Sequence, residues 1–140
     1  MAIAVSKLAI ECKRVKEKLT IVDESTLNYG NSLVAPVIEY ISLHLDDNEL
    51  LGEENLAKII SVSVSTLRRA FKNDTAFNPK EFIIRSRMAY AEHLLRATNI
   101  SVLEISTRVG YNEISGFNRV FKEYFNLSPT IYRKKFKTPL

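Results

Sequence analysis

The sequence predicts an all-α fold in which a long central helix joins two helix-turn-helix subdomains. Glycine and proline are scarce, with four of each in 140 residues, and runs that alternate apolar and polar residues as strands do are rare. Residues 114–132 also repeat residues 64–82 in diverged form, fifty positions downstream without a gap. Two similar basic helices predict two similar surfaces for one repetitive partner, and duplex DNA is the leading candidate. The identical pairs are Ser65/Ser115, Arg69/Arg119, Phe71/Phe121, Lys72/Lys122 and Pro79/Pro129.

Residues 1–32 are expected to form a separate N-terminal region. Five apolar residues at 3-4-3-4 spacing predict an amphipathic helix over 3–19, and a polar, turn-rich linker follows at 23–32. The seam covers about two heptads, short of the three or four that indicate a coiled coil. Two interpretations stay open, because the helix could pair with a second copy of the chain or pack on its own domain. The five residues are Val5, Leu8, Cys12, Val15 and Leu19.

The first subdomain, residues 33–77, is expected to hold three helices. Apolar residues gather on one face of each, and Ser63 is the expected N-cap of the third, because its side chain can accept a hydrogen bond from a free N–H group. The expected helices are about 33–45, 53–61 and 64–74.

The connecting helix is expected within residues 78–98. Asn78 can cap its start, and Pro79 fits the first helical position because its missing N–H would have no partner there. Apolar residues along this helix occupy a wide arc, which predicts that it is contacted on two sides.

The second subdomain, residues 99–140, repeats the pattern of the first. Ser101 and Glu104 have the spacing of a capping box, Gly110 is expected to make a turn, and Asn112 is the expected cap of the next helix. The expected helices are about 101–109, 114–126 and 129–136.

Charge is divided unevenly along the chain. Residues 1–52 carry 5 Lys/Arg and 8 Asp/Glu, net −3, whereas residues 53–140 carry 15 and 8, net +7. The basic charge lies with the repeat, which suggests a polyanionic partner, although charge of this size also serves solubility. No apolar run is long enough to span a membrane, no signal peptide is present, and Cys12 has no cysteine partner, so we expect cytoplasmic residence without membrane association.

The sequence carries no signature of catalysis. The histidines are His44 and His93, no Cys/His cluster has the spacing of metal ligands, and no glycine-rich phosphate loop occurs. Acidic residues are scattered rather than paired. We therefore expect no enzymatic activity, no metal and no cofactor.

The outward faces of the two repeated helices are the candidate DNA-reading surface. A helix fits the major groove, its N-terminal residues reach base edges, and arginine suits a bidentate contact with guanine. Lys72 and Lys122 lie one turn further on and are expected to contact phosphates. The expected base-reading residues are Ser65, Thr66, Arg68 and Arg69 in the first subdomain and Ser115, Gly116, Asn118 and Arg119 in the second.

The arginines of this surface have alternative interpretations. Arg69 and Arg119 could instead pair with acids such as Glu81 or Glu104. Arg68 has no charged counterpart in the second helix, which favours a purely surface role for it.

Three further arginines are expected to contact phosphates: Arg85, Arg87 and Arg133. For Arg85 and Arg87 the alternative is simple solvation. For the basic run 133–135 the alternative is a charge cluster that complements the dipole at a helix C-terminus.

Many spaced positions of residues 101–134, SVLEISTRVGYNEISGFNRVFKEYFNLSPTIYRK, agree with one pattern, and the first subdomain fits the same pattern. The segment resembles the signature of the AraC/XylS family of bacterial transcription regulators, over about residues 34–136 in all. In the second subdomain the matching positions are Ile105, Val109-Gly110-Tyr111, Phe117, Arg119-Val120-Phe121-Lys122, Phe125-Asn126, Ser128-Pro129 and Tyr132-Arg133. In the first they are Leu56-Ala57, Ser63, Leu67, Arg69-Ala70-Phe71-Lys72 and Phe82.

This resemblance implies a seven-helix DNA-binding domain. Its two recognition helices would enter successive major grooves on one face of double-stranded DNA, about one helical turn or ~34 Å apart. Regulators of this kind bind near promoters and contact RNA polymerase, which implies an activator. The alternative is a helical protein-interaction module that binds polymerase or another regulator without reading DNA. The outward faces are basic and polar without an aromatic anchor, which favours DNA.

The chain departs from the family pattern in the turns and at one reading position. Ala76 and Asn126 replace the glycine that usually follows each recognition helix. Asparagine tolerates the left-handed conformation, so the replacement at Asn126 is mild, whereas at Ala76 the turn is expected to be either tighter or strained. Gly116 offers no side chain to the groove, which predicts that the second subdomain reads fewer bases.

Family members usually carry a larger sensing or dimerisation domain before the DNA-binding part. Residues 1–32 are too short for one, so we expect the chain to be a fragment, with a stand-alone regulator as the alternative. A homodimer would then form through residues 5–19 or through the missing domain.

Overall fold

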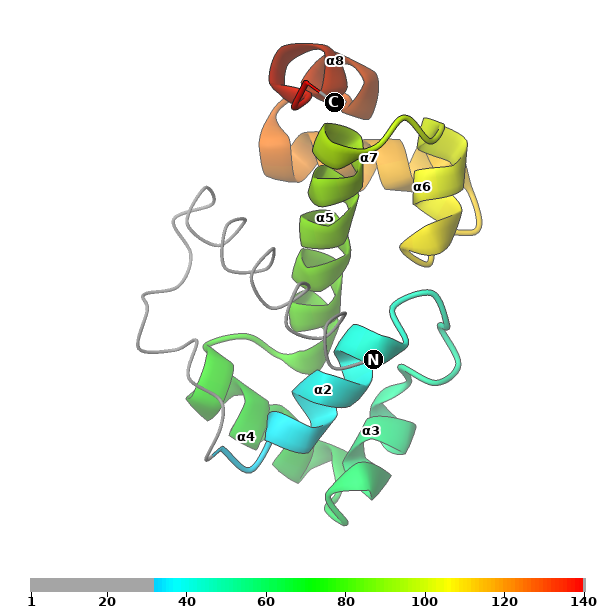
Figure 1. Cartoon of the computed structure of the whole chain (residues 1–140). Helices are drawn as coiled ribbons and strands as arrows, with labels where there is room; N and C mark the ends of the chain where they lie inside the picture. Colours follow the sequence, from blue (N-terminus) through cyan, green and yellow to red (C-terminus); the bar gives the residue numbers. More distant parts are fainter. Residues whose placement is uncertain (1–31, 140) are drawn as a thin grey trace.

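The computed structural model describes residues 32–139, and every regular element in that range is a helix. The all-α fold predicted from the sequence is therefore confirmed, while the predicted helix at 3–19 and its linker lie outside the described residues. Figure 1 shows two groups of helices at opposite ends of the long α5. The helices are α2 (Ala35–Leu43), α3 (Glu53–Ile59), α4 (Val64–Thr75), α5 (Pro79–Ala97), α6 (Val102–Arg108), α7 (Ile114–Phe125) and α8 (Pro129–Phe136).

Helices α2, α3 and α4 pack around the N-terminal half of α5 and form the first core. Its centre is Phe71 of α4, which is fully buried and meets Phe82 of α5 edge to face, with ring centroids 5.3 Å apart. Edge-to-face aromatic pairs stabilise a core beyond the area that they bury. The other fully buried residues of this cluster are Val34, Val37, Ile41, Leu56 and Leu67.

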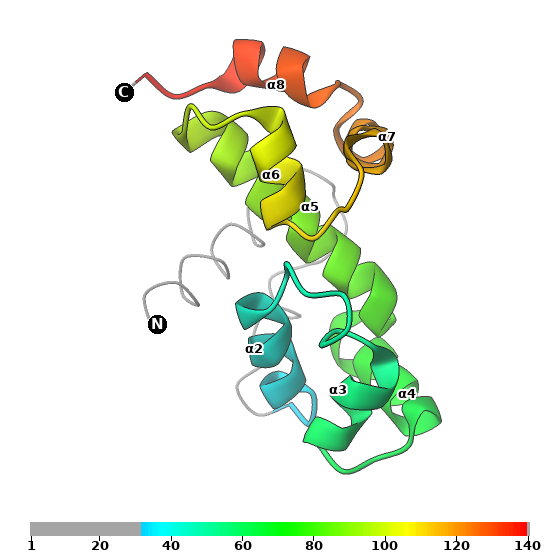
Figure 2. The same ribbon diagram turned by 90° about the vertical axis from the view of Figure 1, so that its right-hand side faces the viewer.

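Helices α6, α7 and α8 pack around the C-terminal half of α5 and form the second core (Figure 2). Phe121 of α7 is the equivalent of Phe71, and its ring contacts Tyr132 of α8 edge to face at 5.4 Å. From α5 this core takes Met88, Ala91 and Leu95, whereas the first core takes Phe82 and Ile83. The predicted contact on two sides of the connecting helix is thus confirmed.

Side-chain caps set four of the helix starts, and the sequence predicts three of them, at Ser63, Asn78 and Ser101. Ser63, Asn78, Ser101 and Ser128 each accept a hydrogen bond from the backbone N–H three residues further on. The prediction for Asn112 is wrong, because α7 begins at Ile114 and its N-cap is Glu113, which makes no side-chain cap.

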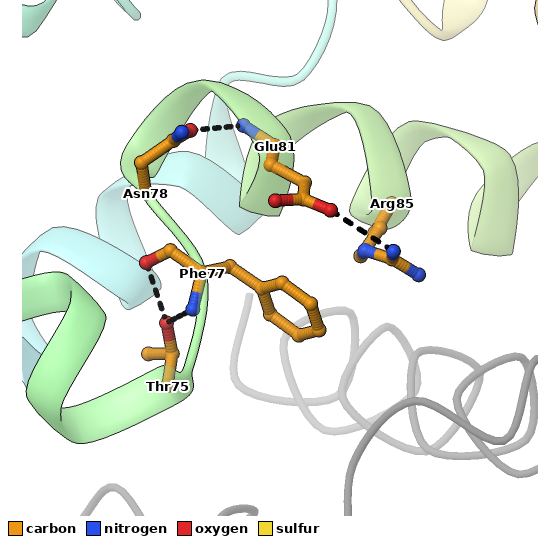
Figure 3. A network of polar contacts seen from close by, with 5 residues as sticks. All are labelled: Thr75, Phe77, Asn78, Glu81 and Arg85. Atoms are coloured by element: carbon orange, nitrogen blue, oxygen red, sulfur yellow. Dashed lines mark hydrogen bonds and ion pairs between the residues drawn. The ribbon is translucent and has the colours of Figure 1, made fainter.

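The turns after α4 and α7 both pass through the left-handed conformation, with φ of 69° at Ala76 and 60° at Asn126. The buried Thr75 supports the first turn. Its hydroxyl donates to the Phe71 carbonyl at 2.7 Å. The same hydroxyl accepts from the Phe77 N–H at 3.1 Å (Figure 3). This conformation costs an L-residue other than glycine about 1–2 kcal/mol, so the strained turn is the alternative that the structure shows at Ala76.

A buried ionic network joins α8 to α5. The Glu92 carboxylate, 1% exposed, accepts from the Tyr132 hydroxyl and from Arg96 Nε, both at 2.6 Å. Burial and this carboxylate together raise the pKa of Tyr132.

No helix within residues 32–139 has the length and hydropathy that crossing a membrane requires.

Candidate nucleic-acid interface

The residues predicted to read DNA lie on helices α4 and α7, and most of them are exposed to solvent. Thr66 and Gly116 are half-buried. The other residues are exposed: Ser65, Arg68, Arg69 and Lys72 on α4 and Ser115, Asn118, Arg119 and Lys122 on α7. The burial of Leu67 and Phe71, and of Phe117 and Phe121, turns these polar faces outward. The two helices therefore offer equivalent surfaces of mixed basic and hydroxyl or amide character.

Arg68 is not the isolated surface cation that the sequence suggests. Its Nε lies 2.9 Å from Glu53 Oε2 of α3, and its Nη2 contacts the same oxygen. A residue three positions before Phe71 lies about 60° from it around the helix, which places Arg68 on the flank of α4 that faces α3. The hydrogen bond to Glu53 raises the pKa of Arg68.

Arg69 lies about 160° from Phe71 around the helix and is exposed at the centre of the outward face. Within residues 32–139 it forms no ion pair, because Glu81 pairs with Arg85 and Glu104 pairs with Arg108. The alternative pairing of Arg69 with either acid is therefore not realised.

Arg119 occupies the equivalent place on α7, and its nearest acid is on its own helix. Arg119 Nη1 lies 3.8 Å from Glu123 Oε1, and both side chains are largely exposed. Exposed pairs at this spacing contribute little, so the guanidinium can turn to another acceptor at small cost.

The two half-buried residues differ in what they can offer. Thr66 belongs to the start of α4, since its hydroxyl accepts from Ser63 Oγ at 3.0 Å and its N–H donates to the same oxygen at 3.2 Å. Gly116 leaves open space, because a Cβ there would meet only Tyr111 Cδ1, at 3.9 Å.

Sequence reasoning missed Asn73 and Glu123. Both are exposed and lie one turn after Arg69 and Arg119 on the outward faces. The i, i+4 spacing from each arginine is the signal that identifies them. Glu123 places an acid where the first subdomain has an amide, so the two surfaces differ in charge at this position, as they do at Arg68 and Asn118.

The predicted phosphate contact of Arg87 is wrong. Its side chain is buried, with the residue 8% exposed, and burial lowers the pKa of the Arg87 guanidinium. Nε donates to the Leu45 carbonyl at 3.0 Å, and Nη2 donates to Asn48 Oδ1 at 2.8 Å. The guanidinium therefore connects α5 to the α2–α3 loop through these two hydrogen bonds.

Arg85 is neither solvated nor presented to the surface. Its guanidinium donates to Glu81 at 3.0 Å and lies over the Phe77 ring at 4.4 Å (Figure 3). The centroid of the Tyr124 ring lies 5.3 Å from the same guanidinium. These contacts correct its assignment as a phosphate contact.

Arg133 holds the end of another helix. Its Nε donates to the Leu95 carbonyl at 3.1 Å, which satisfies one of the free carbonyls at the C-terminus of α5. The side chain thus complements a helix end, as the alternative interpretation supposed, but the helix is α5. Arg133 is half-buried, and its contact with phosphate stays a prediction. Lys134 and Lys135 beside it are exposed.

Comparison with known proteins identifies the family of this chain. A family model described as a helix-turn-helix domain matches residues 56–135, more than half of the chain. The chain belongs to the AraC/XylS family of transcription regulators. It is a DNA-binding domain of the AraC type, with two helix-turn-helix units built around α5.

Curated regulators are similar to this AraC-type domain over part of their length. The Msm operon regulatory protein of Streptococcus mutans is 31% identical over 113 residues, which are 79% of this chain and 41% of that protein. The transcriptional activator RhaS of Enterobacter sp. is 36% identical over 86 residues, 61% of this chain and 31% of that protein. The chain thus spans less than half the length of these relatives.

Solved structures share the fold. The C-terminal domain of AraT, a response regulator from Geobacillus stearothermophilus, matches with a TM-score of 0.71 and 29% identity, covering 76% of this chain and 88% of that one. The DNA-binding domain of AdpA, a global transcriptional factor solved in complex with a target DNA, matches with a TM-score of 0.70 and 26% identity, covering 76% and 94%.

Proposed function

We propose that the AraC-type domain binds promoter DNA sequence-specifically, with α4 and α7 in successive major grooves on one face of the duplex. The observation that carries the proposal is the pair of equivalent helices, each with an exposed arginine at the centre of its outward face, held at the two ends of one helix (Figure 2). The 19 residues of α5 span about 28 Å, which suits a separation near one turn of B-DNA, ~34 Å.

The proposal extends to an activator that contacts RNA polymerase. The name of the relative RhaS, a transcriptional activator, supports the activating role. The rival proposal, a protein-interaction module without DNA reading, finds less support on α4 and α7. Their exposed residues are basic or polar, apart from Ile114 at the start of α7, and include no aromatic anchor.

Selection of bound sites from a random pool of duplex DNA tests the proposal. We expect two sequence motifs about 10 base pairs apart, centre to centre, one for each recognition helix. A single motif would contradict reading by both helices, and enrichment of no motif would favour the protein-interaction module.

Two substitutions then separate base reading from phosphate contact. Arg69→Ala is expected to weaken binding to the selected duplex by about 1–3 kcal/mol and to relax base preference at one position. Lys72→Ala is expected to weaken selected and random duplexes alike and to reduce the salt dependence by about 0.9 in the slope of log K against log salt. Equal losses on both duplexes for Arg69→Ala would remove Arg69 from the reading surface.

A further inference from the structure

The two subdomains are joined at a second place besides α5 itself. The α2–α3 loop of the first subdomain reaches the turn between α6 and α7 of the second, as Figures 1 and 2 show from two sides. At this junction Asn48 Nδ2 donates to the Gly110 carbonyl at 3.0 Å, across 62 positions of sequence. A loop of one subdomain is thus bonded directly to the turn that precedes α7.

Arg87 completes the junction from the middle of α5. Its guanidinium donates to the Leu45 carbonyl at 3.0 Å and to Asn48 Oδ1 at 2.8 Å. The Asn48 side-chain amide therefore makes two hydrogen bonds. Its oxygen accepts from Arg87 of α5, and its nitrogen donates to the Gly110 carbonyl of the second subdomain. Because arginine stays protonated and donates in a fixed planar geometry, it orients the asparagine rather than merely attracting it.

Gly110 allows the close approach that this junction needs. Its φ of +93° lies in the region that favours glycine, and a Cβ would stand 2.5 Å from the Leu45 carbonyl oxygen and 2.7 Å from Arg87 Nη2. The next residue, Tyr111, packs on Phe117 of α7 with ring centroids 5.7 Å apart. The junction therefore fixes the N-terminal end of α7, the end that a recognition helix presents to base edges.

We infer that the contact of Arg87, Asn48 and Gly110, called here the inter-unit clasp, sets the separation and rotation between α4 and α7 and thereby the half-site spacing that the domain accepts. The inference rests on the proposed function, since spacing matters only if both helices read DNA. The clasp residues are positioning residues: Arg87 is buried, and none of the three lies on the outward face of α4 or α7.

Effective concentration links the geometry of the two recognition helices to the affinity of the domain. Two linked modules gain affinity from each other only when their geometry matches the spacing of their sites. One base pair changes the site separation by about 3.4 Å and the rotation by about 36°, because B-DNA has roughly 10 base pairs per turn. A domain held by α5 and the clasp should tolerate such a change poorly, whereas a domain held by α5 alone can bend or twist to follow it.

Asn48→Ala is the variant of choice, because Asn48 is exposed and its loss breaks both links of the clasp without opening the core. The matched control is Glu49→Ala, an exposed neighbour whose side chain makes no hydrogen bond or ion pair within residues 32–139. The probes are duplexes carrying the two half-sites selected by the wild-type domain, at the selected spacing and with one or two base pairs added or removed. A duplex with a single half-site serves as reference.

We expect wild type and Glu49→Ala to lose at least tenfold in affinity for each base pair of displacement. Asn48→Ala is expected to bind the selected spacing about tenfold more weakly and to vary less than about threefold across the series. Its affinity for the single half-site should equal that of wild type. A spacing profile identical to wild type overturns the inference, and so does an equal loss on single and paired half-sites, which would show general damage to the domain.

A measurement without DNA separates failure of the clasp from failure of the proposed function. Spin labels at Lys72→Cys and Lys122→Cys, in a Cys12→Ser background, report the distance between α4 and α7. We expect one narrow distance distribution with Asn48 present and a broader or shifted one in Asn48→Ala. Identical distributions overturn the clasp whatever the domain binds, whereas a changed distribution with a single selected DNA motif refutes only the two-groove proposal.

Discussion

Replacing Ala76 with glycine should stabilise the domain. Ala76 follows α4 with φ of 69°, a conformation that costs an L-residue about 1–2 kcal/mol and costs glycine almost nothing. Against this gain stands the greater freedom of glycine in the unfolded chain, worth about 0.4–1 kcal/mol. Ala76 is exposed, so loss of its methyl group opens no cavity. The net expectation for Ala76→Gly is an increase of about 0.5–1 kcal/mol in the free energy of unfolding.

Urea denaturation and thermal unfolding followed by far-UV circular dichroism measure this change. For a domain of this size the expected gain corresponds to an increase of roughly 2–6 °C in Tm. Asn126→Gly is the matched control in the second subdomain. Its φ is also positive, but asparagine already tolerates the left-handed region, so we expect a clearly smaller gain. Ala76→Val should be less stable than wild type, because a β-branched residue fits this region badly.

The reasoning fails if Ala76→Gly leaves stability unchanged or lowers it, or if Asn126→Gly gains as much. The first result would mean that Thr75, which links Phe71 to Phe77 through its hydroxyl, already relieves the strain of the turn. The second would mean that asparagine is as strained at this φ as alanine is. Affinity for DNA should not change with Ala76→Gly, since the substitution lies beyond the C-terminal end of α4.

Three further outcomes are expected. Gly116→Ala should raise the free energy of unfolding by about 0.5–1 kcal/mol, because alanine favours the helix and its Cβ finds space 3.9 Å from Tyr111 Cδ1; a loss of stability in urea would show that the site is closed. Burial and the Glu92 carboxylate raise the pKa of Tyr132 above its unfolded value of about 10, so its stabilisation is present below about pH 10 and is lost as pH rises through the folded-state pKa. The advantage of wild type over Tyr132→Phe in urea should therefore shrink between about pH 9 and pH 12, and a constant difference would contradict this linkage. Glu53→Gln releases Arg68 and should tighten binding to the selected duplex in fluorescence anisotropy, but not in an Arg68→Ala background; equal effects in both would show that Glu53 acts through the general field.

Local chemistry explains what the sequence predicts well. The caps at Ser63, Asn78 and Ser101 satisfy backbone groups only three residues away, so their spacing alone locates the starts of α4, α5 and α6. The inward faces of α4 and α7 follow from helical periodicity, which places Phe71 and Phe121 in the two cores. The predicted start of α7 at residue 114 agrees with the structure, but the residue at the N-cap is Glu113 rather than Asn112, a choice that local spacing does not determine.

The positions of the arginines depend instead on residues distant in sequence. Arg87 is buried because Leu45 and Asn48, about forty positions earlier, supply acceptors for its guanidinium. Arg68 acquires a partner because α3 packs against one flank of α4 and brings Glu53 to it. Periodicity determines which face of a helix is polar, but it does not show which neighbouring element will cover the edge of that face.

The sharing of α5 between two cores has a thermodynamic consequence. Phe82 belongs to the first core and Met88 to the second, so melting α5 exposes both at once. A duplicated unit would ordinarily be separable, each copy folding independently. Here each core needs α5 as one of its packing helices. The part of α5 that packs in the first core continues directly into the part that packs in the second. We therefore expect the two repeats to unfold as a single cooperative unit, so that a ligand bound to one of them stabilises both.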